Sequence, residues 1–351
     1  MQATDLYSLT PILEGLGITL EKEQPHISGE RFLLSPHKLV LVGTMGSNRV
    51  VIKTSNEPEG KSELKHERRA RETLNKLPFA HHTFFVPKEL LFVERDNYVI
   101  AITAFIAQGK AFIAYPLEEQ FFLALKAFEE QEGVHATTSS HANLIRDVFG
   151  MYDAQDYLND FEVFKNDITE YMRGTGELKS LLEEALQFLR ANKTLIERYS
   201  GFLTHTDFAP HNLRIVDSSL YLLDHTSIHF GNKYESWGRF LNFMAVHNPA
   251  LEKKLAQYVQ ENRGEEEYLS LRLMRVYKAG FLLRFHSQNL SKTTGDLHML
   301  TQARITFWTE ALRSLLADTG IPPIRVEEYV RARNKLRTEE ETRRQKEIGH
   351  L

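Results

Sequence analysis

Polar side chains that could bind a cation and orient a hydroxyl group gather in one short stretch of the sequence. Asp207 and Asn212 lie five residues apart, and Asp224 follows after two short apolar runs joined by the turn-like residues 217–219. A hairpin at this point would bring Asp224 back beside the other two side chains. One carboxylate and one amide oxygen suit Mg²⁺, which prefers oxygen ligands, and the other carboxylate is left to orient a hydroxyl. The segment therefore predicts a magnesium site beside a hydroxyl-orienting aspartate.

The same stretch resembles the catalytic region of the aminoglycoside phosphotransferase and choline kinase-like family, whose loop reads His-x-Asp-x-x-x-x-Asn. The matching positions are His205, Asp207, Asn212, the proline at Pro210, the strand-ending aspartate Asp224 and the glycine seven residues beyond it, Gly231. The resemblance implies that Asp207 is the catalytic residue. It also implies that Asn212 and Asp224 bind the metal.

For the whole chain, the resemblance implies an α+β, two-lobed, protein-kinase-like fold. We expect a small β-rich N-lobe over residues 1–105 and a larger, mostly helical C-lobe over residues 106–351, with the catalytic loop at 205–212. The implied activity is that of an ATP-dependent small-molecule kinase, which uses Mg²⁺ and moves the γ-phosphate of ATP to a hydroxyl acceptor. Aminoglycosides, sugars, amino alcohols and other hydroxyl compounds all remain open as acceptors.

A lysine and a glutamate in the expected N-lobe could complete a nucleotide site. In the resembled family a lysine on the third strand pairs with the nucleotide phosphates, and Lys53 ends the apolar run Val50–Lys53. Its partner should come from the next helix, where Glu67 is favoured over Glu63 and Glu72 because it lies in mid-helix on the apolar face. The alternatives are an exposed strand-end charge for Lys53 and a solvated charge ladder for Glu67.

The adenine-binding linker and the phosphate-covering loop are less well defined. The strand that begins at Tyr98 resembles the one that enters the linker, so the backbone at Phe105 and Ile106 should meet the base. In kinases the loop over the phosphates is glycine-rich, but Gly29, Gly43 and Gly46 do not form a Gly-x-Gly-x-x-Gly pattern. No loop residue is therefore assigned to phosphate binding.

The residues after the metal-binding aspartate also depart from the family pattern. His225 and Thr226 follow Asp224, where protein kinases have Phe-Gly. The family's next aspartate falls where Glu235 and Ser236 stand, and we expect Glu235 to anchor the loop in its place.

The elements that must position these residues follow from the pattern of apolar positions and turn residues. The first part predicts a helix at 5–16, hairpins at 38–54 and 89–106, and a helix at 63–77. The second part predicts helices across most of 117–198, a hairpin within 202–224, helices at 237–246, 266–285 and 297–316, and a charged tail from 326.

Composition narrows the class of protein. The 351 residues carry a formal net charge of −4, so nothing indicates a nucleic acid partner, and the absence of cysteine excludes thiolate metal sites and disulfides. The chain has neither a signal-like start nor an apolar run that could span a membrane, which predicts a cytoplasmic protein without a membrane partner. Its oligomeric state is left open.

Two other functions fit some of the same residues. A two-metal hydrolase could use the histidines and aspartates at His205, Asp207, His211, Asp224, His225 and His229. That reading leaves Asn212, Lys53 and the strand-rich first part without a role. A catalytically inactive kinase-like module is the third possibility, although the lysine, the loop aspartate and the metal-binding aspartate are all in place.

Overall fold

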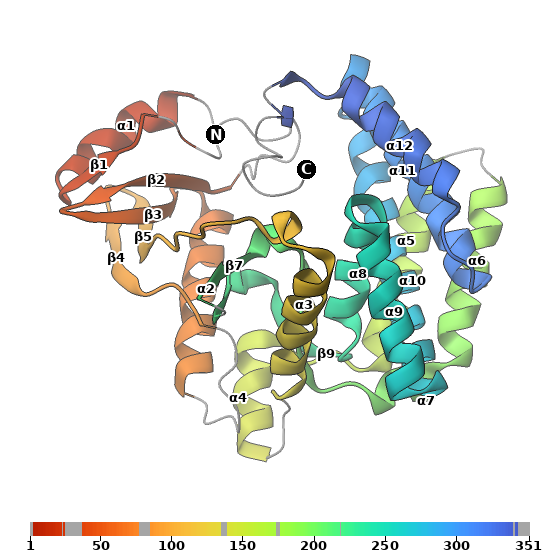
Figure 1. The fold of residues 1–351 in the computed structure, drawn as a ribbon. Helices are drawn as coiled ribbons and strands as arrows, with labels where there is room; N and C mark the ends of the chain where they lie inside the picture. Colours follow the sequence, from red (N-terminus) through yellow and green to blue (C-terminus); the bar gives the residue numbers. More distant parts are fainter. Residues whose placement is uncertain are drawn as a thin grey trace.

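The computed structural model describes residues 3–22, 24, 37–76, 85–134, 139–172, 176–217, 219–339 and 341–342. A small sheet with helices on both faces packs against a larger helical part (Figure 1). This arrangement confirms the predicted α+β, two-lobed fold. The predicted division of the chain at residue 105 stays a prediction.

The N-lobe contains a five-stranded antiparallel sheet in the order β1-β2-β3-β5-β4. Its strands are β1 (Ile18–Leu20), β2 (Leu39–Met45), β3 (Asn48–Ser55), β4 (Glu89–Arg95) and β5 (Tyr98–Ala104). Both predicted hairpins are present. The β4–β5 turn has positive φ at Asp96 and Asn97, 48° and 67°, a conformation that matches the right-handed twist of the strands and that these residues tolerate.

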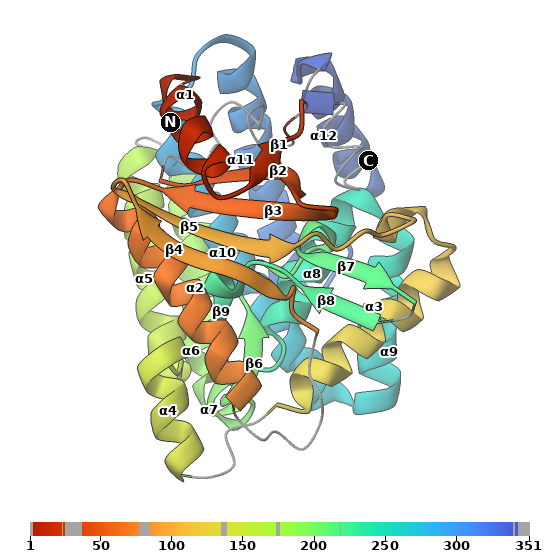
Figure 2. The ribbon, with the colours of Figure 1, turned by 90° about the vertical axis from the view of Figure 1, so that its left-hand side faces the viewer.

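Each face of this sheet is covered by one helix, as Figures 1 and 2 show from two sides. Helix α1 (Ala3–Glu14) places Leu9 and Leu13 in a core with the strand residues Leu41, Ile52 and Ile100. Helix α2 (Pro58–Lys76) packs on the other face through Leu64. Because side chains alternate along a strand, Lys53 lies on the α2 face.

The C-lobe is built around one long central helix. Its helices are α3 (Leu117–Glu132), α4 (Ser139–Phe149), α5 (Ala154–Tyr171), α6 (Gly176–Ala191), α7 (Lys193–Arg198), α8 (Glu235–His247), α9 (Pro249–Arg263), α10 (Glu265–Leu290), α11 (Gly295–Leu316) and α12 (Pro323–Leu336). Helix α10 contacts α5, α8, α9 and α11, so it is buried on several sides. Across the described residues, no helix combines the length and the apolar character needed to cross a membrane.

Short strands and turns interrupt these helices where the catalytic loop is expected. They are β6 (Phe202–His205), the 3₁₀ turn η2 (Pro210–Asn212), β7 (Leu213–Val216), β8 (Ser219–Leu222), the 3₁₀ turn η3 (His225–Ser227) and β9 (Ile228–Gly231). Strands β7 and β8 form the predicted hairpin, while β6 pairs with β9. The loop 206–212 and the segment 223–227 are therefore held at the same end of the β6–β9 pair.

The two lobes are also joined by backbone hydrogen bonds outside the linker that follows β5. The amide of Phe85 donates to the Leu220 carbonyl at 2.9 Å, and the amide of Leu222 donates to the Phe85 carbonyl at 3.0 Å. Phe85 thereby forms a parallel bridge to Tyr221 in β8. The hairpin that precedes Asp224 is thus tied to the chain entering β4.

Candidate active site

An ion pair between the sheet and helix α2 forms the core of the N-lobe part of the site. Lys53 Nζ lies 2.5 Å from Glu67 Oε1, and the Glu67 side chain is only 6% exposed. Burial alone would raise the pKa of Glu67, but the positive charges of Lys53 and His225 outweigh it and lower that pKa. Glu67 is therefore an ionised partner of Lys53, as the mid-helix position predicted, and is not part of a solvated ladder.

A second lysine lies in the same part of the site. Lys38, just before β2, contacts Glu63 with Nζ 3.1 Å from Oε2, and its side chain is largely buried. Burial acts to lower the pKa of Lys38, but Asp224, Glu67 and Glu63 together raise it. Lys38 and Lys53 thus both place positive charge toward Asp224. Lys38 was not predicted from the sequence, since one lysine before a strand has no distinguishing pattern.

Asp224 occupies a strained position at the end of the β7–β8 hairpin. Its φ of 55° and ψ of 66° are left-handed, a conformation that few residues other than glycine adopt readily. Thr226 Oγ1 donates to Oδ1 at 2.5 Å and Ser227 Oγ donates to Oδ2 at 3.1 Å. Burial would raise the pKa of Asp224, but Lys53, Lys38 and the Thr226 hydroxyl lower it to about 2. The carboxylate is consequently held charged and aimed by the two hydroxyls that follow it.

Asp207 meets three donors in the catalytic loop and on helix α8. Arg239 places Nε 2.9 Å and Nη2 2.7 Å from Oδ1. On Oδ2 lie His211 Nε2 at 3.2 Å and Asn212 Nδ2 at 3.2 Å. Burial would raise the pKa of Asp207, but Arg239 and His211 hold it well below its usual range. Asp207 is therefore an ionised carboxylate that orients donors more readily than it takes up a proton.

Backbone contacts join the catalytic loop to the segment of Asp224. The Leu223 amide donates to the Asn212 carbonyl at 2.8 Å. His205 Nε2 lies 3.1 Å from the carbonyl oxygens of both Leu223 and Asp224. Burial lowers the pKa of His205, so its neutral ring acts as a packed hydrogen-bonding spacer between the two segments. This supports the structural role expected for His205 rather than a role in proton transfer.

The oxygen atoms of Asn212 and Asp224 suit a hard divalent cation. Asn212 Nδ2 donates to the Asp207 carbonyl at 2.8 Å and to its carboxylate, which turns the amide so that its Oδ1 is the atom left for a ligand. Each Asp224 oxygen accepts one hydroxyl and retains further acceptor capacity. An amide oxygen and a carboxylate on adjoining segments form the kind of donor set that Mg²⁺ takes with phosphate oxygens.

The linker after β5 lies where the sequence placed the adenine contact. The Phe105 amide already donates to the Arg49 carbonyl at 3.1 Å, and the Arg49 guanidinium lies 3.9 Å from the centre of the Phe105 ring. Phe105 therefore has its amide committed within the sheet. Among the described residues no backbone carbonyl accepts a hydrogen bond from Ile106, so Ile106 is the better placed of the two to meet a base.

Ser236, rather than Glu235, anchors the catalytic loop. Its hydroxyl accepts from the His205 amide at 2.8 Å and donates to Gln131 Oε1 at 2.6 Å. This buried contact ties β6 to α8 and α3. The expectation for Glu235 named the wrong one of two adjacent residues, because the first turn of α8 directs successive side chains to different sides.

Glu235 instead fixes the turn after β9 through a buried polar network. Its carboxylate contacts His229 Nε2 and Lys278 Nζ, both at 2.5 Å, and accepts from the Tyr157 hydroxyl at 2.6 Å. A Cβ on Gly231 would lie 2.2 Å from that same hydroxyl. Only glycine fits there, which gives a physical reason for the glycine that the sequence motif places at this position.

The histidines near the site do not form a metal cluster of the hydrolase type. His205 faces backbone carbonyls, His225 lies 4.0 Å from Glu67, and His229 binds Glu235. Within the described residues, the group of ligands close enough to share an ion is His37, Glu57 and Glu59, which lies at the N-lobe surface. The geometry therefore gives the two-metal alternative no support.

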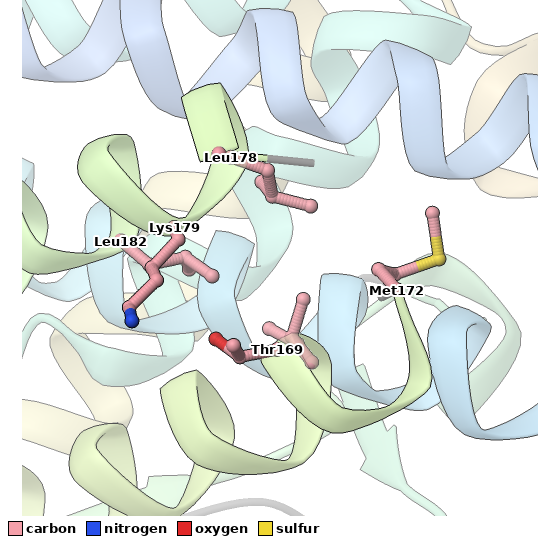
Figure 3. A pocket seen from close by; sticks show the side chains of 7 residues that line it. Thr169, Met172, Leu178, Lys179 and Leu182 are labelled. Atoms are coloured by element: carbon pink, nitrogen blue, oxygen red, sulfur yellow. The ribbon is translucent and has the colours of Figure 1, made fainter. Parts of the chain in front are cut away.

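A pocket of about 240 Å³ opens elsewhere in the C-lobe, between the end of α5 and the start of α6 (Figure 3). Its lining residues are Ile168, Thr169, Met172, Gly176, Leu178, Lys179 and Leu182. None of them belongs to the catalytic loop, the linker or the Lys53 region. We therefore assign this pocket no part in the site.

Comparison with known proteins gives the fold but no close relative. No protein-family model and no curated protein sequence matches the chain. Among solved structures, the GDP complex of a mutant of aminoglycoside 2'-phosphotransferase-IIIa is 14% identical, with a TM-score of 0.62, and covers 89% of this chain and 97% of its own. The apo form of a thermostable mutant of aminoglycoside phosphotransferase APH(4)-Ia is 13% identical, with a TM-score of 0.59, and covers 88% of this chain and 97% of its own. ADP-bound aminoglycoside phosphotransferase APH(2'')-Ib is also 13% identical, with a TM-score of 0.57, and covers 90% and 99%. The chain therefore has the two-lobed fold of the aminoglycoside phosphotransferases.

Proposed function

We propose that this chain is an ATP- and Mg²⁺-dependent phosphotransferase that moves the γ-phosphate of ATP to a hydroxyl group of a small molecule. The observation that carries the proposal is that charged side chains of the N-lobe act on a carboxylate of the C-lobe. Lys53, paired with buried Glu67 in the N-lobe, is the side chain that most lowers the pKa of Asp224 in the C-lobe. Phosphates placed between them would meet two lysines on one side and the cation ligands on the other.

Each proposed residue has a distinct task in this reaction. Lys53, oriented by Glu67, would hold the nucleotide phosphates, with Lys38 adding charge beside it. Asn212 and Asp224 would hold Mg²⁺, which when bound neutralises charge on the phosphates. Asp207 would orient the acceptor hydroxyl for in-line attack. Its low pKa favours orientation in a loose transition state over early removal of the proton.

Known structures of this fold with bound nucleotides support the nucleotide half of the proposal. The solved structures that resemble this chain include complexes with ADP, GDP and AMP-PNP, and three of these also contain hygromycin B. A nucleotide and a small hydroxyl compound are thus bound by proteins of this fold. At 13–14% identity the choice between ATP and GTP and the identity of the acceptor do not carry over.

The direct test is nucleotide turnover by the purified chain. Mg²⁺-dependent hydrolysis of ATP, and transfer from γ-labelled ATP to a panel of hydroxyl compounds, should both be lost in Lys53→Ala. Binding of ATP without turnover under any condition would favour the catalytically inactive module. Absence of nucleotide binding would reject both kinase-like readings.

A further inference from the structure

On the acceptor side of the candidate site, the Asp207 carboxylate already contacts several hydrogen-bond donors. A carboxylate offers about four acceptor positions. On Asp207, two are used by Arg239 at 2.9 Å and 2.7 Å, and the other two by His211 and Asn212, both at 3.2 Å. The Asp207 side chain is 40% exposed, so a hydroxyl can reach the carboxylate, but it meets oxygens that already accept four contacts and binds most directly where one of these donors gives way.

Arg239 is the donor that can leave with the least disturbance of the loop. Both of its nitrogens contact Oδ1, so Oδ2 would keep His211 and Asn212. Asn212 is also fixed by its bond to the Asp207 carbonyl, 2.8 Å long. Arg239 comes from α8, outside the catalytic loop, and its departure would free the whole of Oδ1 for a hydroxyl.

Arg239 cannot leave Asp207 without another anion to bind. Its side chain is only 13% exposed, and a guanidinium does not lose its proton in proteins. Separating such a charge from its partner is costly unless a second partner replaces the first. The exchange therefore requires a negatively charged group to arrive together with the hydroxyl.

The position of Arg239 points to the acceptor rather than the nucleotide as the source of that anion. Lys53 and Lys38 are the cations that act most strongly on Asp224, whereas Arg239 and His211 act on Asp207. Arg239 lies on α8, which packs against α10 within the C-lobe. The nucleotide phosphates have their own lysines on the other side.

The surroundings of Arg239 are aromatic and basic. Along α8, Phe243 lies with its ring centre 5.8 Å from the Arg239 guanidinium, and His247 stacks on Phe243 at 4.1 Å. His211 lies beside the same phenyl ring at 6.4 Å. The Asp207 carboxylate contacts both Arg239 and His211. An anionic group on the acceptor could therefore bind the Arg239 guanidinium beside the hydroxyl-orienting carboxylate.

Building on the proposed phosphotransferase function, we propose that the acceptor carries an anionic group, such as a carboxylate, beside the hydroxyl that receives the phosphate. The anion binds Arg239, and this exchange releases Asp207 Oδ1 to bind the hydroxyl. Arg239 is then a specificity-determining residue, and polycationic aminoglycosides are not acceptors, although the fold is shared with enzymes named for them.

The first experiment measures anion binding without knowledge of the true acceptor. The full chain is saturated with Mg²⁺ and AMP-PNP to fill the nucleotide phosphate sites, and melting temperatures are compared with and without sulfate at constant ionic strength. Sulfate stabilises proteins in general, so the result is the difference between wild type and Arg239→Gln. We expect wild type to gain at least about 2 °C more than the variant, because only wild type has the site-specific part of the stabilisation.

Control variants show whether the effect of sulfate on the melting temperature depends on the charge of Arg239, on correct folding or on arginine side chains in general. Arg239→Lys keeps the charge and should retain part of the sulfate effect. Arg284→Gln changes a similar arginine, which pairs with Asp167 at 2.6 Å, and should behave as wild type toward sulfate. If Arg239→Gln does not fold, Arg239→Lys takes its place, and wild type must then gain more from sulfate than Arg239→Lys does. Equal sulfate gains in wild type and in the Arg239 variant would overturn the proposal.

The second experiment tests transfer itself with matched acceptors. Glucuronate, glucose, glucosamine and hygromycin B are incubated with γ-labelled ATP, and any product is quantified. We expect at least a tenfold preference for the acid over its neutral counterpart, reduced in Arg239→Gln, and no transfer to hygromycin B. Transfer to hygromycin B or glucosamine that equals or exceeds transfer to the acid would refute the inference. If none of the four is phosphorylated, the sulfate comparison decides. Failure of AMP-PNP to bind would instead refute the proposed function and leave that comparison to be made on the free protein.

Discussion

The two halves of the candidate site are built in different ways. The nucleotide half joins both lobes, since Lys38, Lys53 and Glu67 from the N-lobe act on Asp224 of the C-lobe. The proposed acceptor half lies within the C-lobe, where Asp207 contacts Arg239, His211 and Asn212. In our proposal the first half is arranged for phosphates before any ligand binds. The second half exchanges the Arg239 contact when the acceptor binds, so substrate choice would be decided there.

The largest effect should come from removing the charge of Asp224. Asp224→Asn keeps the shape and tolerates the left-handed backbone, but weakens the cation site, and a bound metal supplies several kcal/mol of transition-state stabilisation. Mg²⁺-dependent turnover should therefore fall at least about a thousandfold, since each 1.36 kcal/mol is a factor of ten. Asp217→Asn makes the same change at another left-handed position, with φ of 47°, and should leave turnover unchanged. Near-normal activity of Asp224→Asn at ordinary magnesium would place the metal elsewhere.

Asp207→Asn should distinguish the two halves most clearly, because it should lower phosphate transfer without weakening nucleotide binding. Loss of the hydroxyl-orienting carboxylate should lower phosphate transfer by roughly a hundred- to ten-thousandfold, with the lower end expected if positioning dominates. Nucleotide affinity should stay nearly constant, because the lysines act on Asp224. The measurement is single-turnover transfer or ATP hydrolysis beside calorimetric binding, with a melting curve to show that Arg239, left without its partner, has not unfolded the protein. A matching fall in nucleotide affinity would mean that the halves are not independent.

The lysines of the nucleotide half should contribute unequally to ATP affinity. A hydrogen bond to a charged group contributes about 1.5–3 kcal/mol, so Lys53→Ala should weaken binding by roughly ten- to a hundredfold. Lys38→Ala should weaken ATP binding by about two- to tenfold. Lys38 already pairs with Glu63, so it would attract the phosphates mainly through its positive charge and not through a direct hydrogen bond. Lys65→Ala removes a lysine paired with Glu94 on the exposed side of α2 and serves as the control. Calorimetric titration that gave all three variants wild-type affinity would remove the N-lobe lysines from the site.

The smallest effect concerns acid stability of the nucleotide half. Burial lowers the pKa of His225 to about 3, although Glu67 acts in the opposite direction. Its unfolded form binds a proton below about pH 6.5 while the folded form does not, so stability falls as the pH drops from 6.5 toward 3. His225→Gln should reduce this slope by up to about 1.4 kcal/mol per pH unit. Urea unfolding between pH 7.5 and 4.5 measures it, and equal slopes for both proteins would show that His225 does not stay neutral in the fold.

The parts of the molecule that could be predicted are those encoded by local pattern. Apolar alternation and turn residues gave both N-lobe hairpins, and the motif gave Asp207, Asn212 and Asp224. Lys53 was predicted because the resemblance implies a lysine on the third strand, and Glu67 because helix periodicity places it in mid-helix on the apolar face; the two form an ion pair. Their roles in catalysis and binding remain proposals.

The parts that were missed depend on contacts across the fold. Arg239 reaches Asp207 over 32 residues of sequence, and the pairing of β6 with β9 closes a similar distance. Helix α9 was missed because it follows α8 at once, with Asn248 capping its first turn and Pro249 opening it. One local signal was available, since Arg239, Phe243 and His247 are spaced to share one face of a helix.

The hydrogen bonds at Phe85 have a mechanical consequence. The chain joins the lobes through the linker after β5, and the two backbone bonds between Phe85 and β8 make a second fastening. Helix α2 also packs on the turn η3 and on α4, so any opening of the lobes would have to separate these contacts. Such an opening would draw Glu67 away from His225. The distance between these two side chains is thus a gauge of lobe closure, which spin labels or a fluorescent pair on α2 and the C-lobe could follow as nucleotide binds.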